Sequence, residues 1–405
     1  MTKHQIIIVG GGAGGIAVAS SLLKRDASLD IAIIEPSEQH FYQPGWTMVG
    51  AGIFQKAQMV RTMDAVWPRG VKRIKGAVAT FEPVANSVSL EDGSTVSYDF
   101  LIVAAGLKLD WDAVEGLSKA LGKNGVTSNY RFDLAPYTWE LVQKMRGKTA
   151  IFTQPPMPIK CAGAPQKAMY LSCDAWLKAG KLKGIDVSFC NAGPVLFGCA
   201  PYVPLLMEYV KKYDIALDFG HNLIKIDGPN QTAWFKVTKE GAEPEIVERK
   251  FDMIHVCPPQ CAPAFIKDSP LAGAGGWVDV DQATLQHTKH ANVFGLGDVT
   301  TTPNAKTAAA ARKQAPIVAK NLIACLKGDA LAPLYDGYGS CPLTVENGKI
   351  ILAEFGYGGK LMPSFPWDST KPRRSAWFLK KTILPWVYWN AMLKGREWLT
   401  KTGVK

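Results

Sequence analysis

The segment QIIIVGGGAGGIAVASSLLKRDASLDIAIIE (residues 5–35) decides the fold. It contains a predicted buried strand, a glycine turn, an apolar helix and a second strand that ends at Glu35. Gly10, Gly12 and Gly15 form the pattern G-x-G-x-x-G, which lets the backbone approach a pyrophosphate at the helix N-terminus. Glu35 follows at the spacing of an acid that accepts a hydrogen bond from a ribose hydroxyl. The segment therefore predicts a dinucleotide-binding Rossmann unit rather than a glycine-rich turn without a ligand.

Two later segments indicate a flavin dinucleotide. The segment YDFLIVAAG (residues 98–106) is a predicted buried strand. It ends in two small residues, Ala105 and Gly106, which would pack over the bound dinucleotide. HANVFGLGDV is a predicted strand that ends in Gly297 and Asp298, beside the same ligand. An ordinary helix cap or turn residue is the alternative interpretation of Asp298.

A helix is predicted to follow over residues 305–326. Its N-terminal dipole and Lys306 would stabilise the negative charge that a reduced flavin acquires. Together with the glycine loop, these features predict FAD as the cofactor.

An α/β unit predicted over residues 111–284 interrupts this first domain. Its strands TAIFT, DVSFCNAG and FDMIHVCPP suit a second nucleotide-binding domain, yet QPPMPIKCAGAP follows the first strand in place of a glycine loop. The next strand ends in Asn191 and Ala192 rather than in an acid. Without these parts there is no cradle for a second pyrophosphate, so NAD(P)H is not expected as the electron donor.

The predicted fold class is α/β, with two Rossmann-like domains and a C-terminal segment. Residues 1–110 and 285–330 would form the FAD-binding domain, and residues 111–284 the domain that lacks a nucleotide loop. Residues 331–405 would begin with a hairpin and bind a quinone and the membrane.

The net charge of +11 is concentrated at the C-terminal end. Residues 371–405 contain nine Lys and Arg, four Trp and a single acid, Glu397. Tryptophan and cations together suit a membrane interface, whereas a nucleic-acid binder would spread its charge over the folded domains. The glycine pattern excludes a signal peptide at the N-terminus, and no apolar run is long enough to span a bilayer. These features predict a peripheral membrane protein without an export signal and without a nucleic-acid partner.

A helix is predicted from Pro385 onward. Its polar residues form a narrow stripe at Asn390, Lys394, Glu397 and Lys401, and the rest of its surface is mostly apolar. Such a helix lies in a membrane interface or packs in a groove of its own protein. We expect the membrane interface.

Two of the eight cysteines lie where chemistry is expected. Cys161 precedes a predicted helix, whose dipole would act with Lys160 to favour the thiolate. Cys341 lies in a predicted Ser-Cys-Pro turn. Both could approach one flavin face if the C-terminal segment folds back, and together they could take up a sulfur nucleophile and pass on two electrons. Two unrelated thiols are the alternative.

His255 and the remaining cysteines carry weaker signals. His255, at a strand end, could carry protons near the cysteines, or it could be a hydrogen-bonded core histidine. Cys257 and Cys261 have a spacing compatible with a metal, but no second ligand pair accompanies them, so no metal site is predicted.

The segments IKCAGAPQKAMYL, YQPGWTMVGAG, AKTAAAARKQAP and YGSCPLT together resemble the sulfide:quinone oxidoreductase family over essentially the whole chain. SNYRFDLAPYTWE contains no cysteine, which resembles the two-cysteine branch that includes the mitochondrial enzymes. The resemblance implies a glutathione-reductase-like pair of nucleotide domains, with Cys161 and Cys341 as the redox cysteines. It also implies that sulfide is oxidised to persulfide sulfur and that electrons pass through FAD to a membrane quinone.

The resemblance also implies roles for single residues. Hydrosulfide would attack a disulfide or sulfur-bridged form of the pair, leaving the persulfide on Cys161, with Cys341 facing the flavin. A second sulfur nucleophile, whose identity the sequence leaves open, would remove the extra sulfur. Phe355 and Tyr357 would sandwich the quinone ring, or they are strand aromatics in a core. A homodimer is also left open.

Three competing interpretations fit less well. The flavin subunit of flavocytochrome c sulfide dehydrogenase is exported and binds its flavin on a cysteine in the region matching residues 41–46, where this chain has FYQPGW. A non-covalent FAD is therefore expected. A type II NADH:quinone reductase needs the missing second glycine loop, and a basic flavoprotein scaffold would carry its charge outside the tail.

Overall fold

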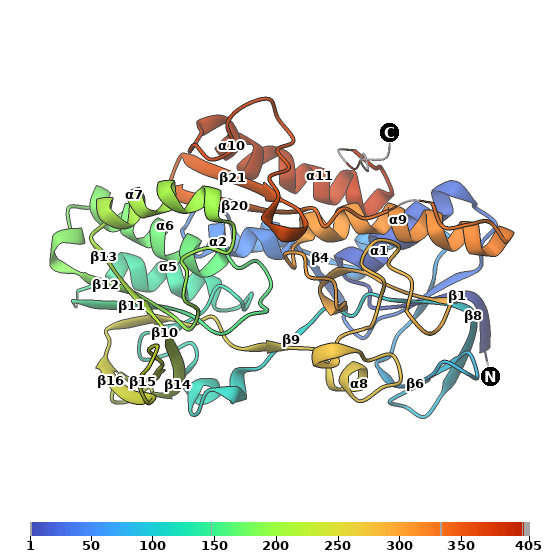
Figure 1. Cartoon of the computed structure of the whole chain (residues 1–405), viewed down its shortest axis with the longest axis horizontal. Coiled ribbons are helices and arrows are strands. Elements are labelled where there is room, and N and C mark those ends of the chain that lie inside the picture. The colour runs from blue at the N-terminus through green and yellow to red at the C-terminus, as the bar shows by residue number, and fades with distance from the viewer. Residues whose placement is uncertain (1, 147, 333, 399, 401–405) are drawn as a thin grey trace.

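The computed structural model describes residues 2–146, 148–332, 334–398 and 400. Two lobes lie side by side, and the C-terminal segment crosses over both of them (Figure 1). This arrangement confirms the predicted α/β class with two Rossmann-like units.

The first lobe is built on a sheet of order β5-β2-β1-β8-β7-β6, with β19 paired to β8. The apolar run of β1 lies between two parallel neighbours, β2 and β8, so nearly every side chain of its second half is buried. The strands are β1 (Thr2–Val9), β2 (Ile31–Ile34), β5 (Lys72–Ile74), β6 (Val78–Glu82), β7 (Ser87–Leu90), β8 (Thr95–Val103) and β19 (Val293–Gly295). The short hairpin of β3 (Gln39–Phe41) and β4 (Val60–Thr62) lies beside this sheet, and the helices are α1 (Ala13–Arg25), α2 (Trp46–Val49), α3 (Met63–Val66), α8 (Ala264–Lys267) and α9 (Ala308–Lys327).

The second lobe has a parallel sheet of order β10-β17-β11-β12-β13 and a separate antiparallel sheet, β14-β15-β16. The parallel strands are β10 (Val126–Thr127), β11 (Thr149–Gln154), β12 (Asp186–Asn191), β13 (Ile215–Phe219) and β17 (Met253–His255). The antiparallel strands are β14 (His221–Asp227), β15 (Thr232–Val237) and β16 (Glu245–Lys250). The helices are α4 (Leu117–Ala120), α5 (Ala135–Lys144), α6 (Ala164–Lys178) and α7 (Val203–Lys212).

The chain crosses between the lobes through β9 (Lys108–Leu109) and β18 (Gln260–Cys261), which pair with each other. After this crossing, Ile266, Leu271 and Val278 already belong to the core of the first lobe. The second lobe therefore ends near residue 262, earlier than the predicted boundary at 284. The sequence missed this return because residues 263–284 contain only two short helical segments, α8 and a 3-10 turn (Ala274–Gly276), and no long strand.

The C-terminal segment joins the lobes. It contains the predicted hairpin, β20 (Gly339–Glu346) and β21 (Lys349–Phe355), then α10 (Arg374–Phe378), a π-helical turn (Leu379–Ile383) and α11 (Leu384–Asn390). Hairpin residues such as Leu343 belong to the core of the second lobe, and Trp389 belongs to that of the first. The segment is therefore part of the fold rather than an appendage.

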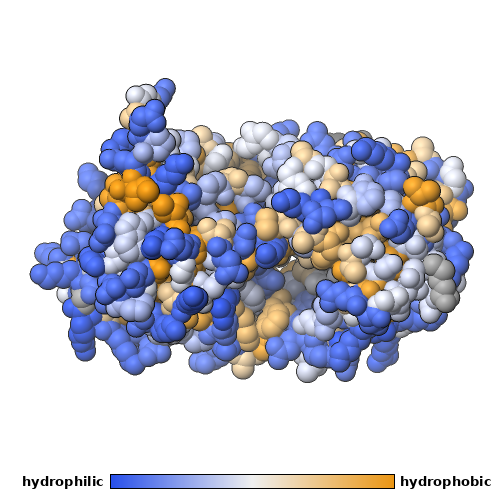
Figure 2. All heavy atoms as spheres, turned by 90° about the horizontal axis from the view of Figure 1, so that it is seen from below, coloured by the Kyte–Doolittle hydropathy of each residue, from blue (hydrophilic) through white to orange (hydrophobic). Residues whose placement is uncertain are grey.

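The face seen from below in Figure 2 is largely hydrophilic. Large exposed apolar side chains occur in the C-terminal segment, where Phe378, Ile383, Trp386 and Trp398 are 58%, 37%, 46% and 53% exposed. The helices that carry most of them lie on the opposite side, at the top of Figure 1.

Candidate functional site

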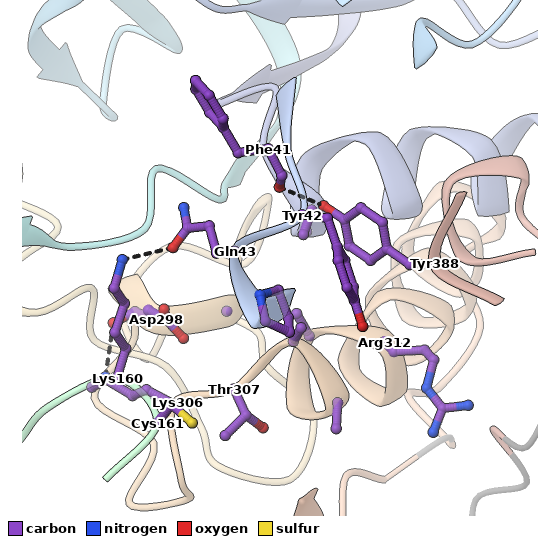
Figure 3. Close-up of a pocket in the computed structure, with 18 of the residues that line it drawn as sticks. Phe41, Tyr42, Gln43, Lys160, Cys161, Asp298, Lys306, Thr307, Arg312 and Tyr388 are labelled. Atoms are coloured by element: carbon purple, nitrogen blue, oxygen red, sulfur yellow. Dashed lines mark hydrogen bonds between the residues drawn. The ribbon is translucent and has the colours of Figure 1, made fainter. Parts of the chain in front are cut away.

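A cavity of about 560 Å³ extends from the glycine loop to the C-terminal segment (Figure 3). Its polar end is the predicted nucleotide site. Gly10 has φ +103°, and a Cβ there would lie 2.7 Å from the carbonyl oxygen of Ala104. A Cβ at Gly15 would lie 1.8 Å from the carbonyl oxygen of Gly10, so the helix can approach the loop only with glycine there. No atom lies within 4 Å of the corresponding position at Gly12, which faces the cavity.

Glu35 holds this loop in place. Its carboxylate accepts hydrogen bonds from the backbone N–H groups of Gly11 at 2.6 Å and Ser37 at 2.8 Å, while the side chain lines the cavity. Its predicted bond to a ribose hydroxyl stays a prediction.

The middle of the cavity is lined by the residues predicted to contact the flavin: Ala105, Gly106, Gly297, Asp298 and Lys306. Burial raises the pKa of Asp298, and burial lowers the pKa of Lys306 to about 8. The ammonium of Lys306 donates to the carbonyl oxygens of Asp298 and Thr300, each at 2.8 Å. Lys306 thus braces the loop before α9 while it lines the cavity. Its predicted role beside a flavin stays a prediction.

Three buried polar side chains in the cavity wall lack hydrogen-bond partners among the described residues. They are the indole N–H of Trp46, the hydroxyl of Thr47 and the amide of Asn129. Buried polar groups are normally paired, so these atoms indicate a polar ligand. With the glycine cradle, the cavity residues fit FAD.

The cysteine pair predicted from sequence meets beside this cavity. Cys161 lines it from the loop before α6, with φ +49°, and Cys341 is buried on β20. A hydrogen bond from the Cys341 thiol holds the pKa of Cys161 well below its usual value, and the Lys167 ammonium acts in the same direction. The hydrogen bond and burial raise the pKa of Cys341. The predicted turn around Cys341 was wrong: the residue is in a strand that packs on α6.

Lysines that sequence reasoning missed surround Cys161. The ammonium of Lys167 donates to the Cys161 sulfur at 3.1 Å. Lys380, from the C-terminal segment, donates to the carbonyl oxygen of Pro44 at 2.9 Å, and burial lowers its pKa to about 7. Lys160, expected to act on the thiol, donates to Gln43 at 2.6 Å and also interacts electrostatically with Cys161. Lys167 could have been found as a cation within the apolar run after Cys161, but no local signal marks Lys380.

His255 does not line the cavity. It is buried, stacks on Phe152 with ring centroids 5.9 Å apart, and accepts a hydrogen bond from the backbone N–H of Asn129 at 2.9 Å. Burial lowers its pKa to about 4. It occupies the position of a core histidine that supports Asn129.

Phe355 and Tyr357 also lie away from the cavity lining. Phe355 packs edge-on against Phe197, with ring centroids 5.8 Å apart. The hydroxyl of Tyr357 donates to the carbonyl oxygen of Gln282 at 2.7 Å. The cavity wall at this end is made instead by other residues of the C-terminal segment, among them Phe365, Leu379, Leu384 and Val387.

In the second lobe, the strand end where a second ribose-binding acid would lie carries Asn191. The side chain of Asn191 accepts from the backbone N–H of Gly193 at 2.9 Å and donates to the carbonyl oxygen of Val195 at 2.8 Å. An acid that could bind a ribose is absent from this strand end, as the sequence indicated.

The helix predicted from Pro385 packs mainly against its own protein. Val387 and Tyr388 are buried and line the cavity, and Glu397 forms a bidentate ion pair with Arg25 on α1. The predicted helix is also shorter than expected, because α11 ends at Asn390 and a 3-10 turn, Met392–Lys394, follows it and packs on α1. The buried side of α11 faces His40 and Tyr42 instead of a membrane interface. Lys401 lies outside the described residues.

In the part of the chain that the structure describes, no helix has both the length and the apolar character needed to cross a bilayer.

Comparisons with known proteins agree on one family. No family model matches the chain. The chain is 45% identical to the mitochondrial sulfide:quinone oxidoreductase of Dictyostelium discoideum, over 98% of this chain and 87% of that protein. It is 40% identical to the mouse mitochondrial sulfide:quinone oxidoreductase, over 97% and 87% of the two chains.

A solved structure shares the fold. The sulfide:quinone oxidoreductase of Aquifex aeolicus superposes with a TM-score of 0.78 at 19% identity, covering 96% of this chain and 92% of that chain. The structural likeness shows a common architecture, and the two full-length relatives show the kinship. The chain belongs to the sulfide:quinone oxidoreductase family.

Proposed function

We propose that this protein oxidises sulfide and reduces a quinone, with non-covalent FAD in the cavity and Cys161 and Cys341 as the pair that takes up the sulfur. The observation that carries the proposal is the meeting of these two thiols, 180 residues apart in sequence, beside a dinucleotide cradle. The full-length relatives are named for this reaction. The cavity segment FYQPGW contains no cysteine that could bind the flavin covalently.

The position of Lys167 favours an order of attack, because its ammonium lies 3.1 Å from the Cys161 sulfur. Hydrosulfide attacks the Cys341 sulfur of a Cys161–Cys341 disulfide; a new S–S bond forms on Cys341 and Cys161 leaves as the thiolate. The thiol with the lower pKa is the better leaving group, and Lys167 stabilises the Cys161 thiolate. This order reverses the one expected from sequence, and it leaves the thiolate on the residue that lines the cofactor cavity.

FAD, when bound, supplies the two-electron acceptor that connects sulfur to quinone. Gly10, Gly12 and Gly15 would hold its pyrophosphate, Glu35 its ribose, and Asp298 would lie beside its flavin end. A nucleophilic sulfur acceptor would then take the outer sulfur from Cys341, which leaves both cysteines as thiolates. Their two electrons would go to FAD as the Cys161–Cys341 disulfide forms again.

The quinone would occupy the apolar end of the cavity, against Phe365, Leu379 and Leu384. This end is formed by the same helices that carry the exposed Phe378 and Trp386 on their outer side. A membrane surface would thus meet the protein beside the quinone site, which supports a peripheral membrane location.

The test is anaerobic absorbance of the flavin after mixing with sulfide. The parent protein should be bleached by sulfide and not by NADH. Cys161→Ser and Cys341→Ser should each lose sulfide-dependent bleaching by at least about 100-fold while FAD stays bound. Cys325→Ser, on α9 and outside the cavity lining, should behave as the parent does. Bleaching of either pair variant at the parent rate would contradict the proposal.

A further inference from the structure

The apolar end of the cavity contains a buried carboxylate that the sulfur chemistry does not use. Glu354, on β21, is 3% exposed and lines the cavity. Three carboxylates of described residues line this cavity: Glu35, Asp298 and Glu354. Glu35 binds the glycine loop and Asp298 precedes α9, so Glu354 is the one that the C-terminal segment contributes.

The Glu354 carboxylate is held by three donors. It accepts hydrogen bonds from the Tyr338 hydroxyl at 2.5 Å, the Ser364 hydroxyl at 2.6 Å and the Ser364 backbone N–H at 3.0 Å. Tyr338 is buried, whereas Ser364 is exposed. Ser364 therefore connects a buried carboxylate on the cavity wall directly to solvent.

The surroundings of Glu354 are otherwise cationic and aromatic. The Lys313 ammonium lies 4.5 Å from the centre of the Tyr338 ring, and Arg312 lines the same wall and donates to the carbonyl oxygen of Trp398 at 2.8 Å. On the backbone side, Tyr202 bonds to the N–H and carbonyl groups of Glu354. These groups, with Tyr338 and Ser364, are the polar neighbours that face it.

Glu354 is close to Cys341 on the hairpin, but the two side chains face different sides. Glu354 pairs with Ser340 and lines the cavity, whereas Cys341 pairs with Ala353 and packs in the core of the second lobe. Figure 3 shows Arg312, which neighbours Glu354 electrostatically, at the opposite side of the cavity from Cys161. The lysines at Cys161 are Lys167 and Lys380, so that end has its own titratable groups. The Glu354 carboxylate has no role in the sulfur chemistry proposed above.

We propose that Glu354 is the proton donor to the quinone, with Ser364 as its link to water and Tyr338 as the residue that positions the carboxyl group. A quinone becomes a quinol by taking up two electrons and two protons. One hydrogen would come from reduced FAD along with the two electrons, so one proton has to come from water. Glu354 gives that proton to a quinone oxygen and is reprotonated from water through Ser364. The electrons are those taken from sulfide, so this inference rests on the proposed function.

The experiment separates the two halves of the reaction in the FAD-loaded full chain. Glu354→Gln keeps the shape of the side chain but cannot carry a proton. Its flavin should be bleached by sulfide within about two-fold of the parent rate, whereas reoxidation by a short-chain quinone should be about 100-fold slower. Glu346→Gln is the matched control, because Glu346 is on the same hairpin but pairs with Lys212 and Lys349 outside the cavity.

Three further readouts distinguish a proton donor from a packing residue. Parent reoxidation should quicken as the pH falls and slow in deuterated water, and both effects should vanish in Glu354→Gln. Quinone affinity, measured by quenching of tryptophan fluorescence, should change less than about three-fold. Proton uptake, followed with an indicator dye, should slow in step with reoxidation. Parent-like reoxidation of Glu354→Gln, or a slow rate explained entirely by lost quinone affinity, would overturn the inference.

Two additional experiments cover the cases in which the Glu354→Gln variant does not fold or sulfide does not reduce the flavin. If Glu354→Gln does not fold, Tyr338→Phe and Ser364→Ala each remove one hydroxyl at the carboxylate, and both should slow reoxidation without changing the bleaching by sulfide; parent rates in both would overturn the inference. If sulfide does not reduce the parent flavin, the proposed function fails. Dithionite then supplies the electrons, and quinone reoxidation tests Glu354 independently.

Discussion

At the scale of single residues, the state of the Cys161 sulfur is set by groups brought from elsewhere in the chain. Its backbone N–H donates to the carbonyl oxygen of Lys306 at 2.8 Å, and the Tyr130 hydroxyl donates to its carbonyl oxygen at 3.3 Å. These bonds hold a non-glycine residue in the left-handed region and direct the thiol toward Cys341 and Lys167.

The lowered pKa of Cys161 predicts how the rate of its alkylation depends on pH. Because the folded thiol ionises below its usual pKa near 9, its alkylation by iodoacetamide should stay at the plateau rate as the pH falls below that value. An ordinary thiol loses about ten-fold in rate per pH unit there. Lys167→Met should raise the pKa and move the fall in rate to higher pH.

Peptide mass spectrometry of the reduced protein measures the labelling of Cys161 alone. The control is Lys178→Met, which removes an exposed lysine from the same helix. A Lys167→Met profile that coincides with that of the parent would show that the ammonium does not act on the thiolate.

At the scale of elements, the turn from β1 into α1 has two roles: it packs against its own backbone and it lines the cofactor cavity. Two of its glycines are needed for different reasons. Gly15 touches the chain itself, since a Cβ there would overlap the carbonyl of Gly10, whereas the space beside Gly12 belongs to the cavity.

Alanine at these two positions should therefore have different effects. Gly15→Ala should destabilise the fold by roughly 1–3 kcal/mol through overpacking and should also release FAD. Gly12→Ala should leave the apoprotein as stable as the parent but reduce FAD retention. Thermal melting and the ratio of flavin to protein absorbance measure the two effects. Gly184→Ala, which meets no atom within 4 Å, is the control. Equal melting temperatures for both loop variants would contradict this division.

At the scale of the whole molecule, the C-terminal segment connects the two lobes and completes the cavity. Its hairpin packs on α6, the turn after α11 (Met392–Lys394) packs on α1, and Leu384 and Tyr388 line the cavity. Removal of this segment would open the cofactor cavity, so membrane binding has to be tested by point substitutions on its outer surface.

The double substitution Phe378→Ser and Trp386→Ser should weaken binding to anionic lipid vesicles. Both side chains are about half exposed, and burying two such groups in lipid stabilises binding by enough to expect at least about a ten-fold loss. FAD content should be unchanged, because neither residue lines the cavity. Vesicle co-sedimentation measures binding, and Val84→Ser, a 92% exposed residue between β6 and β7, is the control. Parent-like sedimentation of the double variant would place the membrane face elsewhere.

Much of the fold could be predicted from local pattern. Three features depend on local conformation and are found where they were expected. They are the glycine turn before α1, the apolar strands β1 and β8, and the hairpin turn at Asn347. The return of residues 263–284 to the first lobe was missed. The apolar side chains of this segment do not repeat with a helical or strand period, so the sequence does not indicate which lobe they pack against.

The sequence by itself determined the nucleotide cradle and the absence of a second one, because backbone geometry at a glycine turn depends on neighbours a few residues away. Only the tertiary structure decided what surrounds the sulfur and the quinone end. Cys341, Lys167 and Lys380 lie around Cys161, and Glu354 is connected to solvent through Ser364. Packing brings these side chains together, and their positions along the sequence do not predict that they are in contact.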